Sequence, residues 1–261
     1  MPKIDQHIPG TPCWFDLTTP DLDAVTPFYT GLFGWEAVDM PTTGGLGVYR
    51  MFRVDGLDVA AASQQLPEFA GQGVLAAWSV YFAGDAAEVA RRAADAGGRV
   101  TLPPSDVGPS GRVAVMADPG GAVFGVWQAG EHKGAGLTGE PGSMAWCELN
   151  TRDYDTCRAY YPEVFGWQGE DLPMDQSRYT IWKLGGAQVA GMLEMTEQWQ
   201  GIPAHWNLYF AADGTDQAAR HAESLGGKVN VPPFDTPYGR LAVLNDPAGT
   251  AFSVVTLPPA G

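Results

Sequence analysis

Hydrophobic and polar residues alternate over short stretches of this chain and recur with helical spacing over longer ones. The stretch "WFDLTT" from Trp14 alternates as a half-buried strand does, and "PDLDAVTPFYTGLF" after it has the spacing of a helix that stops at Gly34. Further strands are predicted at "WEAVDM", "GVYRMFRV" and "DVAAASQQ". The order then recurs with a strand "WSVYFA", a helix "DAAEVARRAADAG", and strands "RVTL", "RVAVMA" and "AVFGVWQ". The first half is therefore predicted to contain two βαβββ modules.

The second half of the chain shows the same order of predicted elements. It begins with a strand at "WCELNT" and a helix over 154–165. The elements expected after these are strands near 167–172, 178–184 and 187–195, a strand "WNLYFA", a helix over 214–225, and strands near 228–231, 240–245 and 250–257. Together the two halves predict an α+β fold.

An internal repeat relates the two halves at an offset of about 130 residues, which is far too long a period for a solenoid. The aligned pairs are Trp14 with Trp146, Phe33-Gly34-Trp35 with Phe165-Gly166-Trp167, Trp78 with Trp206, and Asp118-Pro119 with Asp246-Pro247. A duplication explains the repeat, and we expect one domain over 8–129 and another over 142–258. Residues 130–141 between them read as a Gly-rich linker.

Composition places few further limits on the chain. With 261 residues and 45% hydrophobic content it can form two packed cores, and no apolar run is long enough to span a bilayer. The N-terminal "MPKIDQHIPG" lacks the apolar core of a signal peptide, and three cysteines form no C-x-x-C pair. We expect a cytoplasmic protein, and the duplication favours a monomer, with a homodimer as the alternative.

The net charge of −15 argues against a nucleic-acid partner, because binding phosphate requires a surface rich in Lys and Arg. It also disfavours an anionic membrane. The acidic residues are scattered and serve best as a solubilising surface. Nine tryptophans are many for this length, and Trp is a favoured wall for flat apolar ligands.

The order of elements, with "FY…LFGW" after the first strand and "DPGG" or "DPAG" before the last, resembles the vicinal oxygen chelate superfamily. That family includes proteins similar to glyoxalase I, bleomycin-resistance proteins and extradiol dioxygenases. The chain looks most similar to two-domain glyoxalase-like proteins of actinobacteria, some labelled "hydroxylase" and some found in antibiotic gene clusters. The resemblance implies tandem domains, each made of paired βαβββ modules that form a curved mixed sheet around a ligand cleft.

The resemblance also implies where the family's enzymes bind a divalent metal, on the first and last strands of each module. The corresponding positions in this chain are Trp14, Ala61, Trp78 and Gly125 in the first domain and Trp146, Gly191, Trp206 and Ser253 in the second. None of these side chains is a good metal ligand, since an indole offers no lone pair. The histidines show no paired ligand spacing either; they are His7, His132, His205 and His221. We therefore expect no metal site and no cofactor.

The tryptophans at these positions are expected to fill the metal space and line a cleft for a hydrophobic aromatic molecule. The alternative is that they close redundant clefts as ordinary core. The residues expected to contact the ligand are Trp14, Trp78, Trp127, Trp146, Trp206, Tyr49, Tyr179 and Tyr238. Tyr238 lies in "PPFDTPYGR", which, like "PPSDVGPSGR", either borders the cleft mouth or is a structural hairpin loop.

Asp16 and Glu148 are the predicted catalytic residues, because strand alternation places each on the same face as the preceding Trp. Desolvation beside an indole would raise the carboxyl pKa toward a range useful for proton transfer. The alternative is a carboxylate paired with an arginine such as Arg112 or Arg240, or with backbone N–H groups. By the same alternation, Cys13 and Cys147 fall on the other face as core residues.

Three functions remain open from the sequence. The first is a metal-independent glyoxalase-like protein of secondary metabolism that binds an aromatic or polyketide-type molecule, for ring opening, proton transfer, cyclisation or sequestration. The second is a metal-dependent lyase or dioxygenase of the same superfamily. The third is a non-catalytic interaction or stress-response protein.

Overall fold

The computed structural model describes residues 3–41, 47–66, 76–174 and 177–258. The first half contains β1 (Pro12–Thr19), α1 (Leu22–Phe33), β2 (Glu36–Pro41), β3 (Val48–Val54), β4 (Leu57–Gln64), β5 (Ala77–Ala83), α3 (Ala86–Asp95), β6 (Arg99–Asp106), β7 (Gly111–Ala117) and β8 (Val123–Ala129). The second half contains β9 (Met144–Thr151), α4 (Tyr154–Phe165), β10 (Gln168–Leu172), β11 (Tyr179–Leu184), β12 (Ala187–Glu194), β13 (His205–Ala211), α5 (Thr215–Ser224), β14 (Lys228–Thr236), β15 (Gly239–Asn245) and β16 (Ala251–Thr256).

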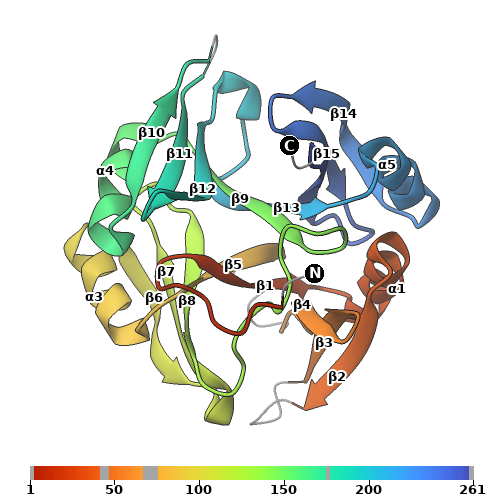
Figure 1. Cartoon of the computed structure of the whole chain (residues 1–261), viewed down its shortest axis with the longest axis horizontal. Coiled ribbons are helices and arrows are strands. Elements are labelled where there is room, and N and C mark those ends of the chain that lie inside the picture. Colours follow the sequence, from red (N-terminus) through yellow and green to blue (C-terminus); the bar gives the residue numbers. More distant parts are fainter. Residues whose placement is uncertain (1–2, 42–46, 67–75, 175–176, 259–261) are drawn as a thin grey trace.

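Each half forms one mixed sheet of eight strands, and the α+β prediction is confirmed (Figure 1). The strand order is β2-β3-β4-β1-β5-β8-β7-β6 in the first sheet and β10-β11-β12-β9-β13-β16-β15-β14 in the second. In the first sheet β1 runs parallel to β4 and antiparallel to β5, so the two βαβββ modules join at its centre. The strand that opens each half therefore lies in the middle of its sheet.

The outermost strands β6 and β14 are longer than their sequence pattern predicts. Each continues through a Pro-Pro pair, at residues 103–104 and 232–233, that we expected to belong to a loop. Both strands form the edge of their sheet, where a residue without a backbone N–H can be accommodated. The pairing register shifts at each pair, between Leu102 and Ser105 and between Val231 and Phe234, so the prolines sit in irregular edge pairing.

The two halves pack against each other through the helix-covered faces of their sheets. Helix α1 lies beside α5, and α3 beside α4, on opposite sides of the molecule (Figure 1). Tyr29 on α1 donates a hydrogen bond to Asp246 of the second half at 3.1 Å, and it accepts one from Trp78 at 2.9 Å. Tyr161 on α4 donates to Asp118 of the first half at 2.8 Å. The equivalent tyrosines of α1 and α4 thus each meet the "DP" motif of the other half across the interface.

The repeated Phe-Gly-Trp motif also joins the halves. The indole N–H of Trp35 donates to the carbonyl oxygen of Gly142, just before β9, at 2.6 Å. The indole N–H of Trp167 donates to the carbonyl oxygen of Gly10, just before β1, at 2.8 Å. Each half therefore binds the segment that leads into the first strand of the other.

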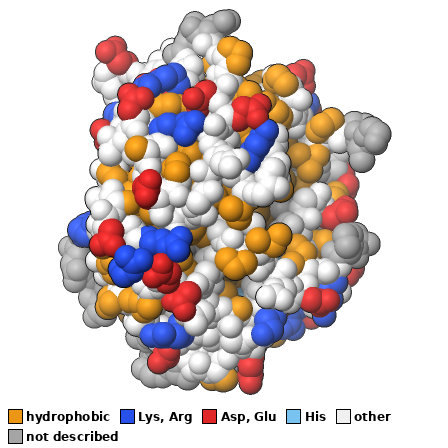
Figure 2. Space-filling view, turned by 60° about the vertical axis from the view of Figure 1, so that its left-hand side comes forward, with side chains coloured by type: hydrophobic (Ala, Val, Ile, Leu, Met, Phe, Trp, Pro, Cys, Tyr) orange, Lys and Arg blue, Asp and Glu red, His pale blue; other side chains and the backbone are white. Residues whose placement is uncertain are grey.

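Acidic and basic side chains lie intermixed on the face of the molecule shown in Figure 2, rather than in separate patches. Many acids there and elsewhere pair with arginines at the surface, as Glu88 does with Arg91 and Arg92 on α3. Within the described residues, no helix is long and apolar enough to cross a membrane.

Candidate functional site

The face of each sheet opposite its own helices carries a cluster of polar and aromatic side chains; we call this the inner face. On the first sheet Trp14 lies opposite Tyr81 across the β1–β5 pair, and Asp16 lies opposite Ser79. On the second sheet Trp146 lies opposite Tyr209 across the β9–β13 pair. Because side chains alternate between faces along a strand, all of these project from the inner face.

On the first inner face, two phenols hold one carboxyl group. The Trp14 indole donates to the Tyr49 hydroxyl at 2.7 Å, and that hydroxyl donates to Asp16 Oδ2 at 3.0 Å. From the other side, Tyr81 donates to both carboxyl oxygens of Asp16 at 3.2 Å. Ser79 hydrogen-bonds to Tyr81 in turn. The result is a continuous chain of hydrogen bonds across β3, β1 and β5.

The second inner face repeats this chain with a longer acid. The Trp146 indole donates to the Tyr179 hydroxyl at 3.2 Å, and Tyr179 also hydrogen-bonds to Glu148. Tyr209 donates to Glu148 Oε1 at 2.9 Å. Each half therefore has the same Trp–Tyr–carboxyl–Tyr arrangement, built from equivalent strands.

Burial raises the pKa of both carboxyl groups, to about 6 for Asp16 and to about 7 for Glu148. The phenol hydrogen bonds favour the ionised form and oppose this rise, but desolvation is the larger effect. A carboxyl group with such a pKa exchanges its proton readily near neutral pH. The alternative of an arginine partner is wrong, since Arg112 pairs with Asp106 and Arg240 with Asp216 and Asp235.

Two glycines make room for the phenols. A Cβ atom at Gly191 would lie 2.2 Å from the Tyr179 hydroxyl oxygen and 2.9 Å from the Trp146 indole nitrogen. A Cβ atom at Gly125 would lie 2.1 Å from the Tyr81 ring. Both glycines stand where the family resemblance implies a metal ligand, so the aromatic side chains occupy the space next to those positions.

Two of the predicted ligand-binding tryptophans do not lie with the others. Trp78 pairs with Leu17, not with Trp14, and so projects from the helix-covered face. Trp206 likewise pairs with Leu149, and its indole donates to Tyr161 on α4 at 3.2 Å. Equivalent positions in the sequence repeat do not determine which face of a strand a residue projects from, because a shift of one residue in strand register reverses the face. Both tryptophans are core residues between the two halves.

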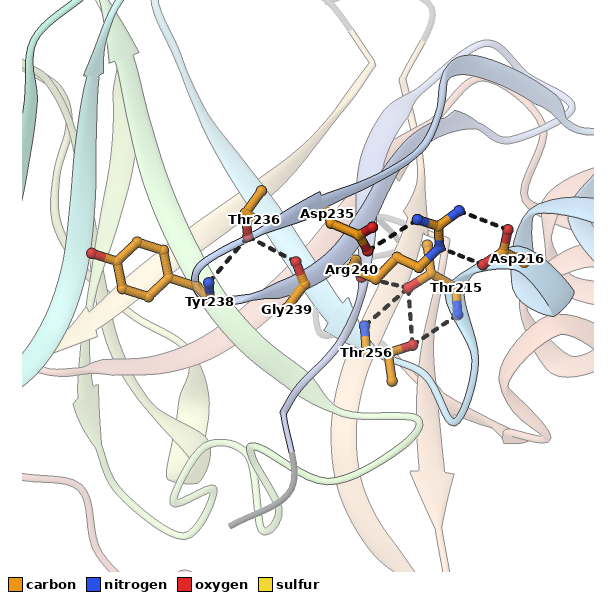
Figure 3. Close-up of polar contacts among 8 residues, drawn as sticks. All are labelled: Thr215, Asp216, Asp235, Thr236, Tyr238, Gly239, Arg240 and Thr256. Atoms are coloured by element: carbon orange, nitrogen blue, oxygen red, sulfur yellow. Dashed lines mark hydrogen bonds and ion pairs between the residues drawn. The ribbon is translucent and has the colours of Figure 1, made fainter. Parts of the chain in front are cut away.

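The other predicted residues lie in different surroundings. Tyr49 and Tyr179 hold the carboxyl groups, as described above. Trp127 is buried on the inner-face side of β8, two residues from Gly125, and donates to the carbonyl oxygen of His132 at 2.9 Å. Tyr238, in the turn between β14 and β15, is half exposed and points away from the cluster of Asp235 and Arg240 (Figure 3). A role for Tyr238 at the cleft mouth stays a prediction.

The inner faces do not offer a suitable donor set for a metal ion. With the strand register known, the implied ligand positions are held by Trp14, Ala61, Ser79 and Gly125 in the first sheet and by Trp146, Gly191, Asn207 and Ser253 in the second. Divalent metals in such sites need several His nitrogens or carboxylate oxygens. Within the described residues, no three His, Cys, Asp or Glu side chains gather closely enough to hold an ion. Asp16 and Glu148 each already accept two phenol hydrogen bonds.

The second inner face carries a further polar group at His205, which lies opposite Asn150. Its Nδ1 lies 2.9 Å from the carbonyl oxygen of Pro203, so this nitrogen carries the proton and donates. Its Nε2 then accepts from the Asn150 amide nitrogen at 3.4 Å. Burial lowers the pKa of His205, which keeps the ring neutral near pH 7.

Tyr81, Tyr209, Ser79 and Asn207 belong to the site but were not predicted from the sequence. Their signal was present, because Tyr81 and Tyr209 align in the internal repeat with a polar residue two positions earlier in both halves. Only the pairing register of β5 on β1 shows that Ser79 and Tyr81 lie on the same face as Asp16, and that Trp78 lies on the opposite face. The three cysteines are buried, and burial raises the pKa of each thiol.

Two family models match this chain in succession. Residues 12–126 match the Glyoxalase/Bleomycin resistance protein/Dioxygenase superfamily, and residues 146–255 match a glyoxalase-like domain. The anthracycline biosynthesis protein DnrV of Streptomyces peucetius is 42% identical over 97% of this chain and 96% of its own length. The protein named "Putative glyoxylase CFP32" of Mycobacterium tuberculosis is 40% identical over 99% of both chains.

Solved structures share the fold at low sequence identity. The Mn(II)-bound glyoxalase from Novosphingobium aromaticivorans superposes with a TM-score of 0.66 at 16% identity, covering 95% of this chain and 82% of that one. The 2,2',3-trihydroxybiphenyl 1,2-dioxygenase from Sphingomonas wittichii superposes with a TM-score of 0.63 at 13% identity, covering 95% and 91%. At this identity the likeness concerns the fold alone.

Proposed function

Because the chain belongs to the glyoxalase/bleomycin resistance protein/dioxygenase superfamily, we propose that it binds an aromatic, polyketide-type small molecule on the inner face of a sheet and transfers a proton on that ligand without a metal. The observation that carries this proposal is the carboxyl group held by two phenols, Asp16 in one half and Glu148 in the other. The proton moves between this carboxyl group and an acidic position of the ligand.

The surroundings of Glu148 suit that role. Its pKa of about 7 means that the protonated and ionised forms are both populated at neutral pH, so the group can act as an acid or as a base. Tyr209 and Tyr179 fix its orientation, and the half-buried Trp146 next to them offers a flat apolar wall. A proton-transfer group beside an aromatic wall fits an aromatic ligand with an acidic C–H or O–H bond.

The similarity to DnrV supports the ligand class. That relative matches almost the whole chain and is named as an anthracycline biosynthesis protein. The donor set described above supports a metal-free step, in contrast to the Mn(II)-bound glyoxalase that shares the fold.

Deuterium exchange tests the proposal directly. The probe is 2-acetyl-1-naphthol, an aromatic ketone whose methyl C–H bonds exchange slowly in D2O. On binding, the probe should quench the Trp fluorescence of the native protein. The protein should also accelerate deuterium uptake at the methyl group, with or without EDTA. Glu148→Gln or Asp16→Asn, whichever lies at the ligand, should reduce this acceleration by about a hundredfold or more.

The exposed Glu163→Gln on α4 serves as the matched control and should leave exchange unchanged. Probe binding without accelerated exchange would favour sequestration over catalysis. A purified protein that holds a stoichiometric divalent metal and loses exchange with EDTA would contradict the proposal.

A further inference from the structure

The two inner faces differ in how far the chain itself covers their tryptophans, whereas the carboxyl groups of Asp16 and Glu148 are both buried. Trp14 is only 3% exposed, whereas its counterpart Trp146 is half-buried. The His132 ring stands edge-on against the Trp14 ring, with 4.3 Å between ring centroids, and its own carbonyl oxygen accepts from Trp127. His132 belongs to the linker, which therefore covers the Trp14 end of the first inner face.

The linker is fixed in this position by several backbone contacts. The N–H of Ala135 donates to the carbonyl oxygen of Cys13 in β1, and the N–H of Gly136 donates to that of Asp58 in β4, both at 2.7 Å. The N-terminal segment adds a hydrogen bond from His7 Nε2 to the carbonyl oxygen of Ala135 at 2.9 Å. Because these bonds join the linker to the central strands, the cover over Trp14 is part of the folded domain.

The faces also differ in their polar side chains. The strand register pairs four inner-face positions of the second sheet with four of the first; these are Asn150 with Thr18, His205 with Ala77, Asn207 with Ser79, and Ser253 with Gly125. Asn207 donates to Ser253 at 2.8 Å and contacts Tyr209, so its amide extends the hydrogen-bond chain from Glu148 toward β16. The second face thus presents two amides, an imidazole and a hydroxyl where the first presents two hydroxyls, a methyl group and a glycine.

We propose that the chain has one ligand site, on the inner face of the second sheet, that it takes an aromatic compound bearing hydroxyl or carbonyl groups, and that His132 closes the equivalent face of the first sheet. This inference rests on the proposed function and narrows it to Glu148 as the reacting acid. Amides such as Asn207 both donate and accept hydrogen bonds, so they suit oxygen substituents placed around an aromatic ring. Asp16 keeps the same two phenol partners in the first sheet, but His132 covers the Trp14 wall beside it.

The covering of Trp14 is tested without any ligand. Hydroxyl-radical footprinting of the full chain, resolved for each tryptophan by mass spectrometry, should oxidise Trp146 severalfold faster than Trp14, with the fully buried Trp182 as the unreactive reference. His132→Ala should raise the oxidation of Trp14, and His132→Phe, which keeps a ring in place, should not. Equal oxidation of Trp14 and Trp146 in the unmodified chain would overturn the inference while leaving the proposed function untouched.

The ligand class and the number of sites are tested by calorimetric titration with alizarin, a dihydroxyanthraquinone. The chain should bind one molecule, and Asn207→Ala should weaken binding about tenfold, as expected for one lost hydrogen bond. Asn230→Ala on the exposed edge strand β14 is the matched control and should bind as the native chain does. Two equivalent sites, or equal affinities for the two variants, would overturn this inference alone. A chain that takes up no alizarin would contradict both the inference and the proposed function.

Discussion

At Glu148, desolvation and hydrogen bonding act on the pKa in opposite directions. Burial favours the neutral acid, whereas the hydroxyls of Tyr179 and Tyr209 favour the carboxylate. The value of about 7 is the result of this opposition. The phenols therefore do more than hold the acid in place, because they keep its pKa within the range in which it can still lose a proton.

Removing one phenol hydroxyl should shift the pKa of Glu148. Tyr209→Phe takes away a donor to the carboxylate while the ring continues to bury it, so the pKa of Glu148 should rise by about one unit. Carbon-detected NMR titration of the glutamate carboxyl groups measures this shift. A fall in the pKa, or no change, would show that the Tyr209 hydroxyl does not favour the ionised form of Glu148.

Stability should depend on pH through the same carboxyl group. Its pKa is raised in the folded state, so its contribution is fully present below the ordinary glutamate value near 4.5 and is lost as pH rises through about 7. Over that range the native chain should lose roughly 3 kcal/mol relative to Glu148→Gln, whose amide does not ionise. Urea unfolding of both proteins between pH 4.5 and 8 measures the difference. Parallel curves would contradict the raised pKa.

The sequence predicts part of this residue-level arrangement. Strand alternation alone places Asp16 beside Trp14 and Glu148 beside Trp146, and the structure shows both on one face. Their phenol partners come from other strands, and only the pairing register identifies Tyr81 and Tyr209. Trp78 was misplaced for the same reason, because one residue of register separates the inner face from the core.

At the level of single elements, the glycine in β12 determines whether the second site can form. A methyl group at Gly191 would clash with the Tyr179 hydroxyl and the Trp146 indole, both of which are held by the hydrogen bond between them. Gly191→Ala should therefore displace Tyr179 and destabilise the chain by about 1–3 kcal/mol. Gly136→Ala in the linker is the control, since its Cβ would make only ordinary contacts with Leu57. Thermal unfolding distinguishes the two variants, and equal melting temperatures would contradict the close packing.

The elements themselves follow well from the sequence, with identifiable exceptions. Helix α4 has the bounds predicted from periodicity, and α1 forms with Pro27 inside it. Strands β6 and β14 are the exception, since local pattern marks a Pro-Pro pair as a loop. Their position at the sheet edge makes those prolines tolerable, and edge position is a property of the whole sheet that no local stretch contains.

At the level of the whole molecule, the two halves depend on each other. The aromatic side chains between them include Phe82 against Trp206 and Trp78 against Phe210, with ring centroids 5.2 and 5.0 Å apart. Either half alone would expose this surface to water. The family predicted from the repeated motifs is confirmed, and the structure adds that the same motifs bind one half to the other.

Separated halves should therefore be unstable. Residues 1–138 and 139–261 expressed alone should bind a dye for exposed apolar surface and unfold without a sharp transition. Co-expressed, they should associate and recover the cooperative unfolding of the intact chain. Size-exclusion chromatography and calorimetry measure both outcomes. Two independently stable, monomeric halves would show that the interface contributes little.

The exchange of contacts at Trp35 and Trp167 has a consequence for synthesis in the cell. The first half emerges from the ribosome before the residues that cover its helix-covered face have been synthesised, since Gly142 and Phe210 lie in the second half. During that interval the nascent chain presents an aromatic surface that resembles the one still to be made, and neighbouring nascent chains offer the same surface. Translation pace over the second half, and any chaperone that protects the first, would then determine how much of this protein reaches its native pairing.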